Sequence, residues 1–294
     1  MVDLETAFPL ARLTTIGTGG AAKALARPTS LADLEQAIAW AAERGLDVVT
    51  VGLGSNVLPA DDGVDALVLR LEGDLAAVSI DGGVLSAGGG ATNAVCLHRA
   101  RTAGLGGLEF ACAIPGTAGG GVRMNAGAYG SDWAAILERA LVVSAAGTAW
   151  STADELGLSY RHSDLQPGDV VARVEYRLTP RPTDEIKAEV ADLVGRRKAT
   201  QPTNKRTFGS VFKNPPGELG AGRMLELCGL KGYRIGGAMI SPRHANFIEN
   251  ADGATSADCL ALIREARRRA REEYGVELEH EVVLWGLTPL APDA

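Results

Sequence analysis

The chain has 294 residues, more than one average hydrophobic core requires, so two or three domains are expected. Apolar residues make up 46% and charged residues 22%, which excludes an intrinsically disordered chain. The formal net charge of -7 disfavours nonspecific binding to nucleic acid or to an anionic membrane. Neither a run of about 18 apolar residues nor a signal-peptide pattern is present. The sequence therefore predicts a cytoplasmic protein without a membrane partner.

The cysteines are widely spaced and contain no C-x-x-C pair. They are Cys96, Cys112, Cys228 and Cys259. This spacing favours buried, reduced thiols and gives no indication of a metal site.

The start of the chain has the pattern of a small α/β unit. Ser30–Arg44 is expected to be a helix, because Ser30 and Asp33 suit a capping box and the apolar residues follow at helical spacing. Asp47–Val51 and Ala66–Leu71 are short apolar runs that predict strands. A helix combined with such strands suggests an α/β arrangement.

From about residue 72 to residue 180, short apolar runs alternate with glycine. The runs expected to be strands are Val84–Ala87, Leu141–Ser144 and Val170–Leu178. Thr92–Ala103 is a helix candidate within this stretch. The pattern predicts a second, strand-rich domain.

The last third of the chain begins with a composition change. Two prolines in Thr179–Thr183 predict a linker, and the amphipathic Asp184–Thr200 predicts a helix after it. Ser256–Tyr274 predicts a second helix, whose many arginines favour a solvated face. Val276–Trp285 alternates between apolar and polar residues, which predicts a final strand with Glu277, Glu279 and Glu281 on one solvated face.

Two glycine clusters are candidates for ligand contact. Gly52–Asn56 follows an apolar strand and offers free backbone N–H groups to phosphate oxygens, although a turn without a ligand has the same pattern. Ile114–Gly121 runs into Met124–Gly130 with few bulky side chains, so a flat or extended ligand could lie against its backbone. An earlier cluster, Gly17–Gly20, lacks the G-x-G-x-x-G spacing of a dinucleotide fingerprint.

Three side chains are candidates for chemistry, each with a structural alternative. Ser210 follows a glycine and could donate a proton, or it could be an ordinary turn serine. The flanking sequence is not a G-x-S-x-G elbow, which argues against a hydrolase nucleophile. Arg161 could equally be a surface arginine, and Glu281 could equally belong to a solvated strand face.

Seven segments in this order resemble the family of UDP-N-acetylenolpyruvoylglucosamine reductases. They are Gly52–Asn56, Gly104–Phe110, Ile114–Gly120 with Met124–Gly130, Ser159–Ser163, Gly209–Pro215, Gly229–Ala238 and Ser241–Asn250. The resemblance covers nearly the whole chain. The chain is similar to the shorter type of the family, which lacks an inserted loop with a substrate-contacting tyrosine.

The resemblance implies an α+β fold with a two-part FAD-binding domain of the vanillyl-alcohol-oxidase type and a C-terminal α+β substrate-binding domain. The implied parts are an α/β subdomain (1–71), a strand-rich subdomain (72–182), the substrate-binding domain (183–278) and a C-terminal strand that returns to the FAD-binding part (279–294). The implied reaction is the NADPH-dependent reduction of UDP-N-acetylglucosamine enolpyruvate to UDP-N-acetylmuramate for peptidoglycan synthesis. FAD would be bound non-covalently, in a monomer or weak oligomer.

The resemblance also implies a role for each matching residue. Ser210 would be the general acid, Arg161 would stabilise developing negative charge, and Glu281 would complete the catalytic group. FAD would be held by Gly52, Leu53, Gly54, Ser55, Asn56, Pro115, Gly116, Thr117, Gly119, Gly120, Asn125, Gly127, Ala128 and Tyr129. The substrate would be held by Lys213, Asn214 and His244, although His244 and Asn246 could equally be a buried hydrogen-bonded pair.

Two other hypotheses remain open. Another flavin oxidase or dehydrogenase of the same FAD-binding fold would not need the Gly209–Pro215 segment or the terminal glutamate. A non-catalytic nucleotide-binding protein would not need Arg161, Ser210 and Glu281 together.

Overall fold

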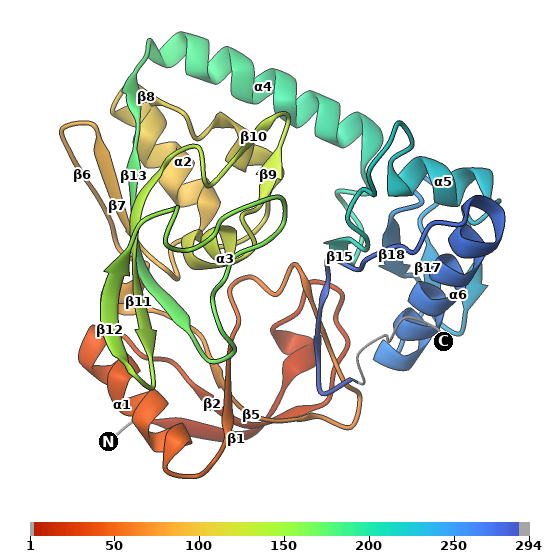
Figure 1. The fold of residues 1–294 in the computed structure, drawn as a ribbon, viewed down its shortest axis with the longest axis horizontal. Coiled ribbons are helices and arrows are strands. Elements are labelled where there is room, and N and C mark those ends of the chain that lie inside the picture. Colours follow the sequence, from red (N-terminus) through yellow and green to blue (C-terminus); the bar gives the residue numbers. More distant parts are fainter. Residues whose placement is uncertain (1–2, 288–294) are drawn as a thin grey trace. The chain divides into compact units, whose positions relative to one another are not determined.

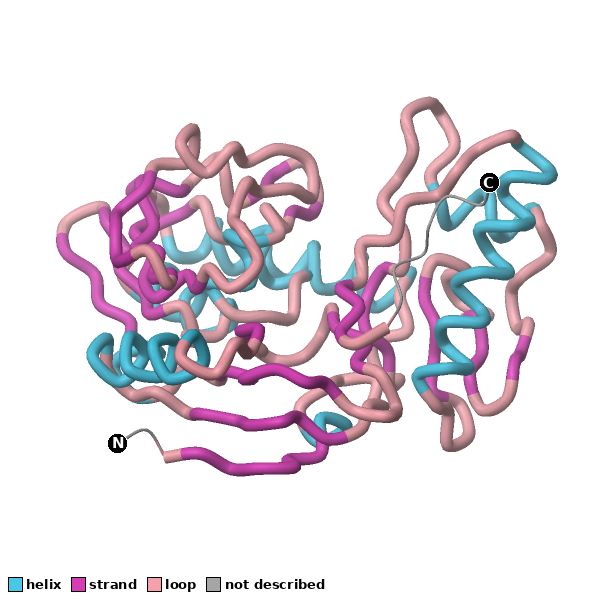
Figure 2. Tube along the Cα trace, turned by 60° about the horizontal axis from the view of Figure 1, so that its bottom comes forward, coloured by secondary structure: helices cyan, strands magenta, loops and turns pink. Residues whose placement is uncertain are grey.

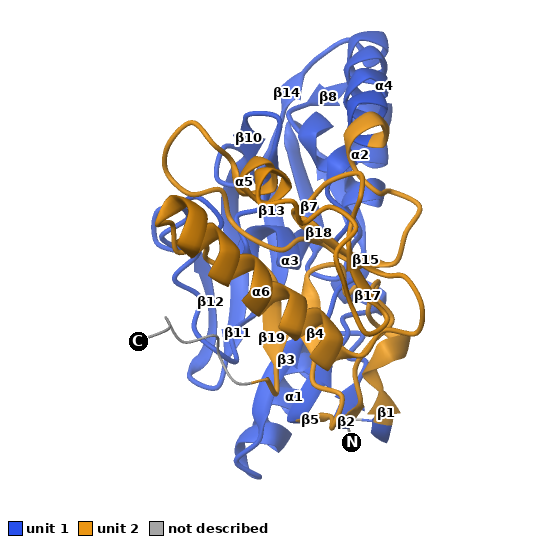
Figure 3. Cartoon of the chain, turned by 90° about the vertical axis from the view of Figure 1, so that its right-hand side faces the viewer, with its two compact units in different colours: residues 1–7, 23–53, 65–197 blue, residues 8–22, 54–64, 198–294 orange. Residues whose placement is uncertain are grey.

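The computed structural model describes residues 3–287. The chain forms two compact units, which Figure 3 shows in different colours. Unit 1 consists of Met1–Ala7, Lys23–Leu53 and Asp65–Arg197. Unit 2 consists of Phe8–Ala22, Gly54–Val64 and Lys198–Ala294. These two units are defined by compactness and do not test the division into four functional parts, which stays a prediction.

One sheet near the start of the chain has the strand order β1-β2-β5-β3 (Figure 1). Its strands are β1 (Leu4–Pro9), β2 (Ala21–Ala26), β3 (Asp47–Thr50) and β5 (Val64–Leu69), and β3 runs parallel to β5. Helix α1 (Leu31–Ala42) begins at Ser30, where both hydrogen bonds of the expected capping box are present. The buried face of α1 packs into a core that includes Leu67 and Leu69 of β5. The predicted helix and both predicted strands are confirmed.

The strand-rich part of unit 1 is a five-stranded antiparallel sheet in the order β12-β11-β13-β7-β6. Its strands are β6 (Val78–Asp81), β7 (Val84–Gly88), β11 (Leu137–Ser144), β12 (Gly147–Ser151) and β13 (Val170–Arg177). Helix α2 (Asn93–Thr102) begins after Thr92, whose side chain accepts a hydrogen bond from the Val95 N–H. A buried hydrogen bond of 2.6 Å from Trp133 Nε1 to Tyr176 Oη lies in the core. The three predicted strands and the helix are confirmed.

The glycine cluster Ile114–Gly121 contains regular structure. Its second half is the short helix α3 (Ala118–Arg123), with Thr117 as N-cap. Other short elements of the chain are β8 (Leu105–Gly106), β9 (Gly127–Ala128), β10 (Ser131–Asp132) and the 3-10 turns η1 (Leu10–Arg12), η2 (Gly73–Ala76) and η3 (Glu109–Ala113). The cluster is therefore a turn followed by a helix.

The predicted linker at Thr179–Thr183 is largely wrong. Its first two residues form β14 (Thr179–Pro180), which pairs with β8, and helix α4 (Thr183–Thr200) begins directly afterwards. Proline is tolerated at a strand edge and just before a helix, so two prolines do not require an irregular linker. Arg181 forms an ion pair of 3.0 Å with the buried Glu109.

Unit 2 contains an antiparallel sheet in the order β15-β18-β17-β16. Its strands are β15 (Thr207–Ser210), β16 (Arg234–Ile235), β17 (Ala238–Ile240) and β18 (Phe247–Asn250). Helices α5 (Ala221–Leu227) and α6 (Ser256–Tyr274) share its hydrophobic core, and Figure 2 shows the long α6 beside the strands. A separate parallel pair joins β4 (Val57–Pro59) to β19 (Val283–Trp285).

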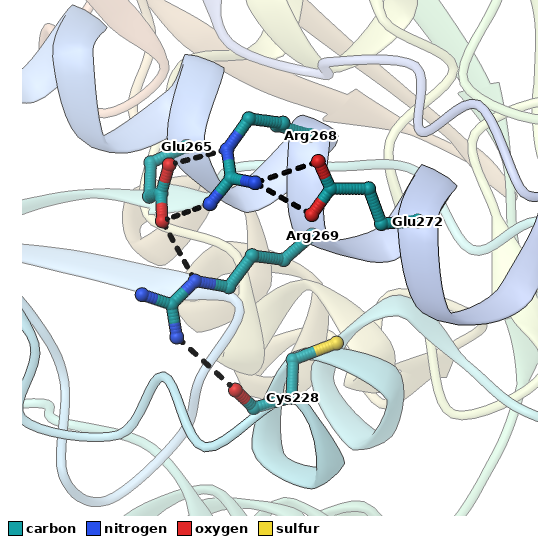
Figure 4. Close-up of polar contacts among 5 residues, drawn as sticks. All are labelled: Cys228, Glu265, Arg268, Arg269 and Glu272. Carbon is teal, nitrogen blue, oxygen red and sulfur yellow. Dashed lines mark hydrogen bonds and ion pairs between the residues drawn. The ribbon is translucent and has the colours of Figure 1, made fainter.

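Several arginines of α6 form ion pairs, whereas the sequence predicted a purely solvated face. Arg268 donates hydrogen bonds to Glu265 and Glu272, and Arg269 donates to Glu265, as Figure 4 shows. Arg267 is only 8% exposed and pairs with Glu277. The pKa of Glu265 is lowered to about 2, and the largest cause is the hydrogen bonding from Arg268.

The predicted final strand is correct only at its end. β19 begins at Val283, and before it only His280 makes a strand-like bridge, to Phe212. Glu277 and Glu279 do not share a purely solvated face, because they pair with Arg267 and Lys213 respectively. Both side chains are nevertheless exposed and Leu278 between them is buried, so the predicted alternation of exposure is present although the segment is not a regular strand.

The cysteines are free thiols. Cys96 and Cys259 are buried, and burial raises the pKa of each to about 12. Cys112 and Cys228 are half-buried, so the expectation of burial is confirmed for two of the four. Residues 3–287 contain neither a helix long and apolar enough to cross a membrane nor a cluster of three metal-ligating side chains.

Candidate active site

The two glycine clusters meet within unit 1. A Cβ atom on Gly52 would lie 2.6 Å from Oγ1 of Thr117, so only glycine fits at this approach. Gly52 follows β3, and Thr117 is the residue at which α3 begins. Two segments that the sequence predicts as cofactor contacts are therefore side by side, and both present backbone with little side chain.

Asn93 fastens the Ile114–Gly116 turn. Its N–H donates to the carbonyl of Gly116 and its Nδ2 donates to the carbonyl of Ile114, each over 3.0 Å. Both carbonyl oxygens of the turn therefore accept a hydrogen bond from Asn93. The Oδ1 atom of Asn93 is buried and has no hydrogen-bond partner within residues 3–287, and such an acceptor calls for an explanation. The sequence analysis missed Asn93, since a polar residue at a helix start is ordinarily explained as part of a cap.

Two glycines of α3 have a packing role. A Cβ atom on Gly121 would lie 2.6 Å from the Trp133 ring, and one on Gly119 would lie 2.9 Å from the carbonyl oxygen of Val171. These glycines let the short helix approach the sheet closely. Contact of Gly119 and Gly120 with a cofactor stays a prediction.

Backbone strain is concentrated around the Met124–Gly130 loop and Arg161. Within residues 3–287, the only non-glycine residues with positive φ are Asn125 (34°), Tyr129 (55°), Arg161 (52°) and Ala7 (53°). Three of these four are predicted site residues. Such conformations cost free energy and persist only where surrounding contacts impose them, and they are enriched at functional sites.

Asn125 supplies many of those contacts. Its side chain is 1% exposed, and its Nδ2 donates to the carbonyl of Ser159 over 2.8 Å while its Oδ1 accepts from the N–H of Ala134 over 2.9 Å. The guanidinium of Arg161 donates to the carbonyl of Gly127 over 2.6 Å. The structure therefore brings Arg161 together with the Asn125–Tyr129 segment inside unit 1.

Tyr129 joins this loop to α4. Its hydroxyl donates to the carbonyl of Leu193 over 3.2 Å, and the guanidinium of Arg196 lies 4.8 Å from the centre of its ring. The strained loop is thereby tied at both ends, to the Ser159 segment by Asn125 and to the long helix by Tyr129.

Ser210 lies at a β-bulge in unit 2. Thr207 pairs with Glu249 and Ser210 with Phe247, so three steps along β15 oppose two along β18. Gly209 has a φ of 83° at this irregularity. Bulges of this kind redirect side chains next to active sites. A Cβ atom on Gly209 would lie 3.3 Å from the carbonyl oxygen of Ser55, so the second glycine cluster ends beside the predicted general acid.

Thr15 holds this junction and was missed by the sequence analysis. Its hydroxyl donates to the carbonyl of Thr207 over 2.6 Å, and its N–H donates to the carbonyl of Gly54 over 3.0 Å. The threonines before Gly17–Gly20 are the only sequence feature that could have indicated this role. The spacing of the glycines does not fit a dinucleotide fingerprint, so the cluster was not predicted as a site.

Glu281 is placed next to the same strand. Its N–H donates to the carbonyl of Val211 over 2.7 Å, and its carbonyl accepts from Nδ2 of Asn56 over 3.1 Å. The structure therefore brings Asn56, Ser210 and Glu281 into one neighbourhood within unit 2. Arg161 belongs to unit 1.

The predicted substrate residues have defined partners. Nζ of Lys213 is 2.6 Å from Oε1 of Glu279, and the Lys213 side chain is 19% exposed. Oδ1 of Asn214 accepts from the N–H of Ala221 over 3.0 Å, at the start of α5. Nδ1 of His244 accepts from the N–H of Asn246 over 3.2 Å. Burial, and then the positive charge of Lys231, lower the pKa of His244.

Comparison with known proteins gives two family matches along the chain. Residues 22–153 match the model described as "FAD binding domain". Residues 201–285 match the model described as "UDP-N-acetylenolpyruvoylglucosamine reductase, C-terminal domain". The expected combination of an FAD-binding part and a reductase-type C-terminal domain, both of mixed helices and strands, is confirmed.

Named relatives are similar over nearly their whole lengths. UDP-N-acetylenolpyruvoylglucosamine reductase 2 of Symbiobacterium thermophilum is 42% identical over 98% of this chain and 94% of its own length. The UDP-N-acetylenolpyruvoylglucosamine reductase of Anaeromyxobacter dehalogenans strain 2CP-C is 45% identical over 96% of this chain and 85% of its own. The crystal structure of the reductase (MurB) from Thermus caldophilus superposes with a TM-score of 0.83 at 37% identity, covering 97% of this chain and 99% of that one. The chain therefore belongs to the family of UDP-N-acetylenolpyruvoylglucosamine reductases.

Proposed function

We propose that this protein reduces UDP-N-acetylglucosamine enolpyruvate to UDP-N-acetylmuramate, with NADPH as the reductant and FAD as a non-covalently bound cofactor. The observation that carries the proposal is the similarity to named reductases over nearly the whole chain, including the reductase-type C-terminal domain. An oxidase or dehydrogenase that shared only the FAD-binding part would not require that domain. The product is a precursor of peptidoglycan.

The residues of unit 1 fit a flavin nucleotide. Gly52 and the Ile114–Thr117 turn form a close backbone surface, and the buried Oδ1 of Asn93 is an acceptor beside that turn. We propose that Gly52–Asn56, at the pyrophosphate, and Ile114–Gly130 hold the cofactor. FAD supplies hydride-transfer chemistry when it is bound.

Ser210 is proposed to deliver the proton. Addition of hydride to the β-carbon of the enolpyruvyl group places negative charge on the α-carbon and its carboxylate, and the α-carbon must then take a proton. A serine hydroxyl is a weak acid, but an enolate-like carbon is basic enough to accept its proton if the serine is well positioned. The bulge at Gly209 provides such a fixed position for Ser210.

Three ionisable residues are proposed to support this step. Arg161 would stabilise the charge that develops on the carboxylate, because a positioned cation stabilises a transition state more than the ground state. Lys213 would stabilise the serine oxygen after it has lost its proton. Its ammonium group forms an ion pair of 2.6 Å with Oε1 of Glu279. Glu281 would donate a hydrogen bond to the substrate carboxylate if it is protonated.

The setting of the enzyme is also a proposal. We expect a cytoplasmic monomer or weak oligomer whose substrate is the UDP-sugar, with no nucleic acid or membrane as partner. The net charge of -7 supports the last point, because an acidic protein is repelled by polyanions.

The test measures the visible spectrum of the purified protein and its NADPH oxidation with and without the enolpyruvyl substrate. A flavin spectrum with substrate-dependent oxidation is expected. Ser210→Ala should lower turnover by about 10²–10⁴-fold while reduction of the bound flavin by NADPH persists. The exposed Ser79 provides the control Ser79→Ala, which should change neither. A flavin spectrum with no response to this substrate would favour an oxidase, and a protein that takes up no FAD would overturn the proposal.

A further inference from the structure

Asn246 makes an unusual pair of contacts in unit 2. Its Nδ2 donates to the carbonyl of Phe212 over 2.8 Å, and its Oδ1 accepts from the N–H of the same residue over 2.9 Å. The side chain is 4% exposed. A carboxamide has the donor and acceptor of a peptide group, so Asn246 pairs with Phe212 as a residue of a neighbouring strand would.

The segment that Asn246 holds carries the predicted chemistry. Phe212 lies two residues after Ser210 and directly before Lys213. The other side of this segment is held by Glu279 and Glu281, through hydrogen bonds from Lys213 N–H to the Glu279 carbonyl and from Glu281 N–H to the Val211 carbonyl. The segment is therefore clamped on both edges after the regular strand β15 has ended at Ser210.

The backbone of Asn246 extends this connection. Its carbonyl accepts from the N–H of Val211 over 2.9 Å, and its N–H donates to Nδ1 of His244 over 3.2 Å. One buried residue is thus bonded to the Ser210–Lys213 segment and to His244, a predicted substrate contact. An apolar side chain would avoid the cost of burying an amide, but it would leave both polar groups of Phe212 without these bonds.

We propose that Asn246 is a positioning residue that fixes Ser210 and Lys213 for protonation of the substrate. This inference rests on the proposed function, because it takes Ser210 as the proton donor. Asn246 does not act as a catalytic residue itself. It sets the path of the backbone between the bulge and Lys213, and thereby the direction of the Ser210 hydroxyl and of the ammonium group.

The experiment compares Asn246→Ala with Asn250→Ala. Asn250 is a matched control in the same strand β18, because its side chain also makes two backbone hydrogen bonds, to the Ile16 carbonyl and from the Ala254 N–H. Neither bond involves the Ser210 segment. Rapid mixing then separates flavin reduction by NADPH from flavin reoxidation by the enolpyruvyl substrate.

Asn246→Ala should slow reoxidation by substrate by roughly 10²-fold and leave reduction by NADPH within about 2-fold, since a small misplacement of a reacting group has effects of this size. The loss should be in kcat more than in KM. Asn250→Ala should leave the rates of both half-reactions unchanged. Hydrogen exchange should show faster exchange across residues 211–213 in Asn246→Ala only. Equal slowing in both variants, or an unchanged substrate step in Asn246→Ala, would overturn the inference.

A second variant covers the case in which Asn246→Ala does not fold. Asn246→Asp keeps the acceptor for the Phe212 N–H and loses the donor to its carbonyl, so it should show the same selective defect. Failure of the proposed function is distinguishable, because then the unaltered protein would not be reoxidised by this substrate at all. In that case hydrogen exchange still tests whether Asn246 holds residues 211–213. If exchange at these residues were the same in both Asn246 variants as in the unaltered protein, this structural role would be overturned as well.

Discussion

Ser210 lies at the end of a paired strand, whereas Arg161 lies in a loop of strained residues. Around Ser210 the chain is held by backbone hydrogen bonds on both edges and by the side chain of Asn246 on one of them, and its one positive φ falls on a glycine, Gly209. Around Arg161 three residues with side chains adopt positive φ, and buried side-chain bonds from Asn125 hold the loop. Both arrangements depend on a buried asparagine, but only the second places residues other than glycine in strained conformations.

The largest effect on stability is expected at the strained loop. Asn125→Ala should lower the free energy of unfolding by about 3 kcal/mol, because it leaves the Ala134 N–H without its partner and removes one of the two hydrogen bonds that the Ser159 carbonyl accepts. Urea unfolding measures this loss. The exposed Asn204 provides the control Asn204→Ala, which should stay within about 0.5 kcal/mol of the unaltered protein. A loss below about 1 kcal/mol in Asn125→Ala would mean that backbone contacts hold this loop as well.

A smaller effect is expected at the bulge. Gly209→Ala should cost about 1–2 kcal/mol, since a residue with a Cβ is disfavoured at a φ of 83°. The matched control is Gly195→Ala in α4, where a Cβ meets nothing within 4 Å and φ is not positive. That change should stabilise by about 0.5–1 kcal/mol. Thermal unfolding of both variants should therefore shift in opposite directions, and shifts in the same direction would contradict the role given to Gly209.

The smallest effect is expected on α6, away from both regions. Glu265→Gln should cost about 1 kcal/mol or less near neutral pH, the usual size for partly exposed ion pairs. The pKa of Glu265 is lowered from 4.5 to about 2, so the folded state binds its proton less readily than the unfolded state does. The stabilisation is present above pH 4.5 and is lost as the pH falls towards 2. Unfolding curves across this range should converge for the two proteins, and a constant difference would refute the assignment.

The sequence predicts the elements that have strong local signals. α1 and α6 have capping boxes and helical spacing, and β7, β11 and β13 are apolar runs, so these were correct. The final strand was wrong over most of its length, because regular pairing begins only at Val283, where the chain meets β4, and the sequence does not show where that partner lies.

The candidate site shows the same limit. Motif residues such as Asn125 could be named from the sequence, but the contacts that hold the site together could not. Asn93 and Asn125 contact segments 9 or more positions away, and Asn246 contacts one 34 positions away. A buried asparagine has no periodic pattern that marks it, and its function depends on a backbone carbonyl or N–H that the sequence does not place. Tertiary contacts therefore decide this part of the site.

The parallel pair of β4 and β19 has a consequence for the time at which the protein becomes competent. Asn56 and Glu281 are bonded across 225 positions of the chain. A ribosome that adds about 5–20 residues per second needs roughly 10–45 s to make the second partner after the first. Until then β4 has no β19 beside it, and Ser210, made earlier than Glu281, waits for its neighbour. A pause in translation before codon 281 would thus yield a nascent chain in which β4 and Ser210 lack their partners from the C-terminal segment.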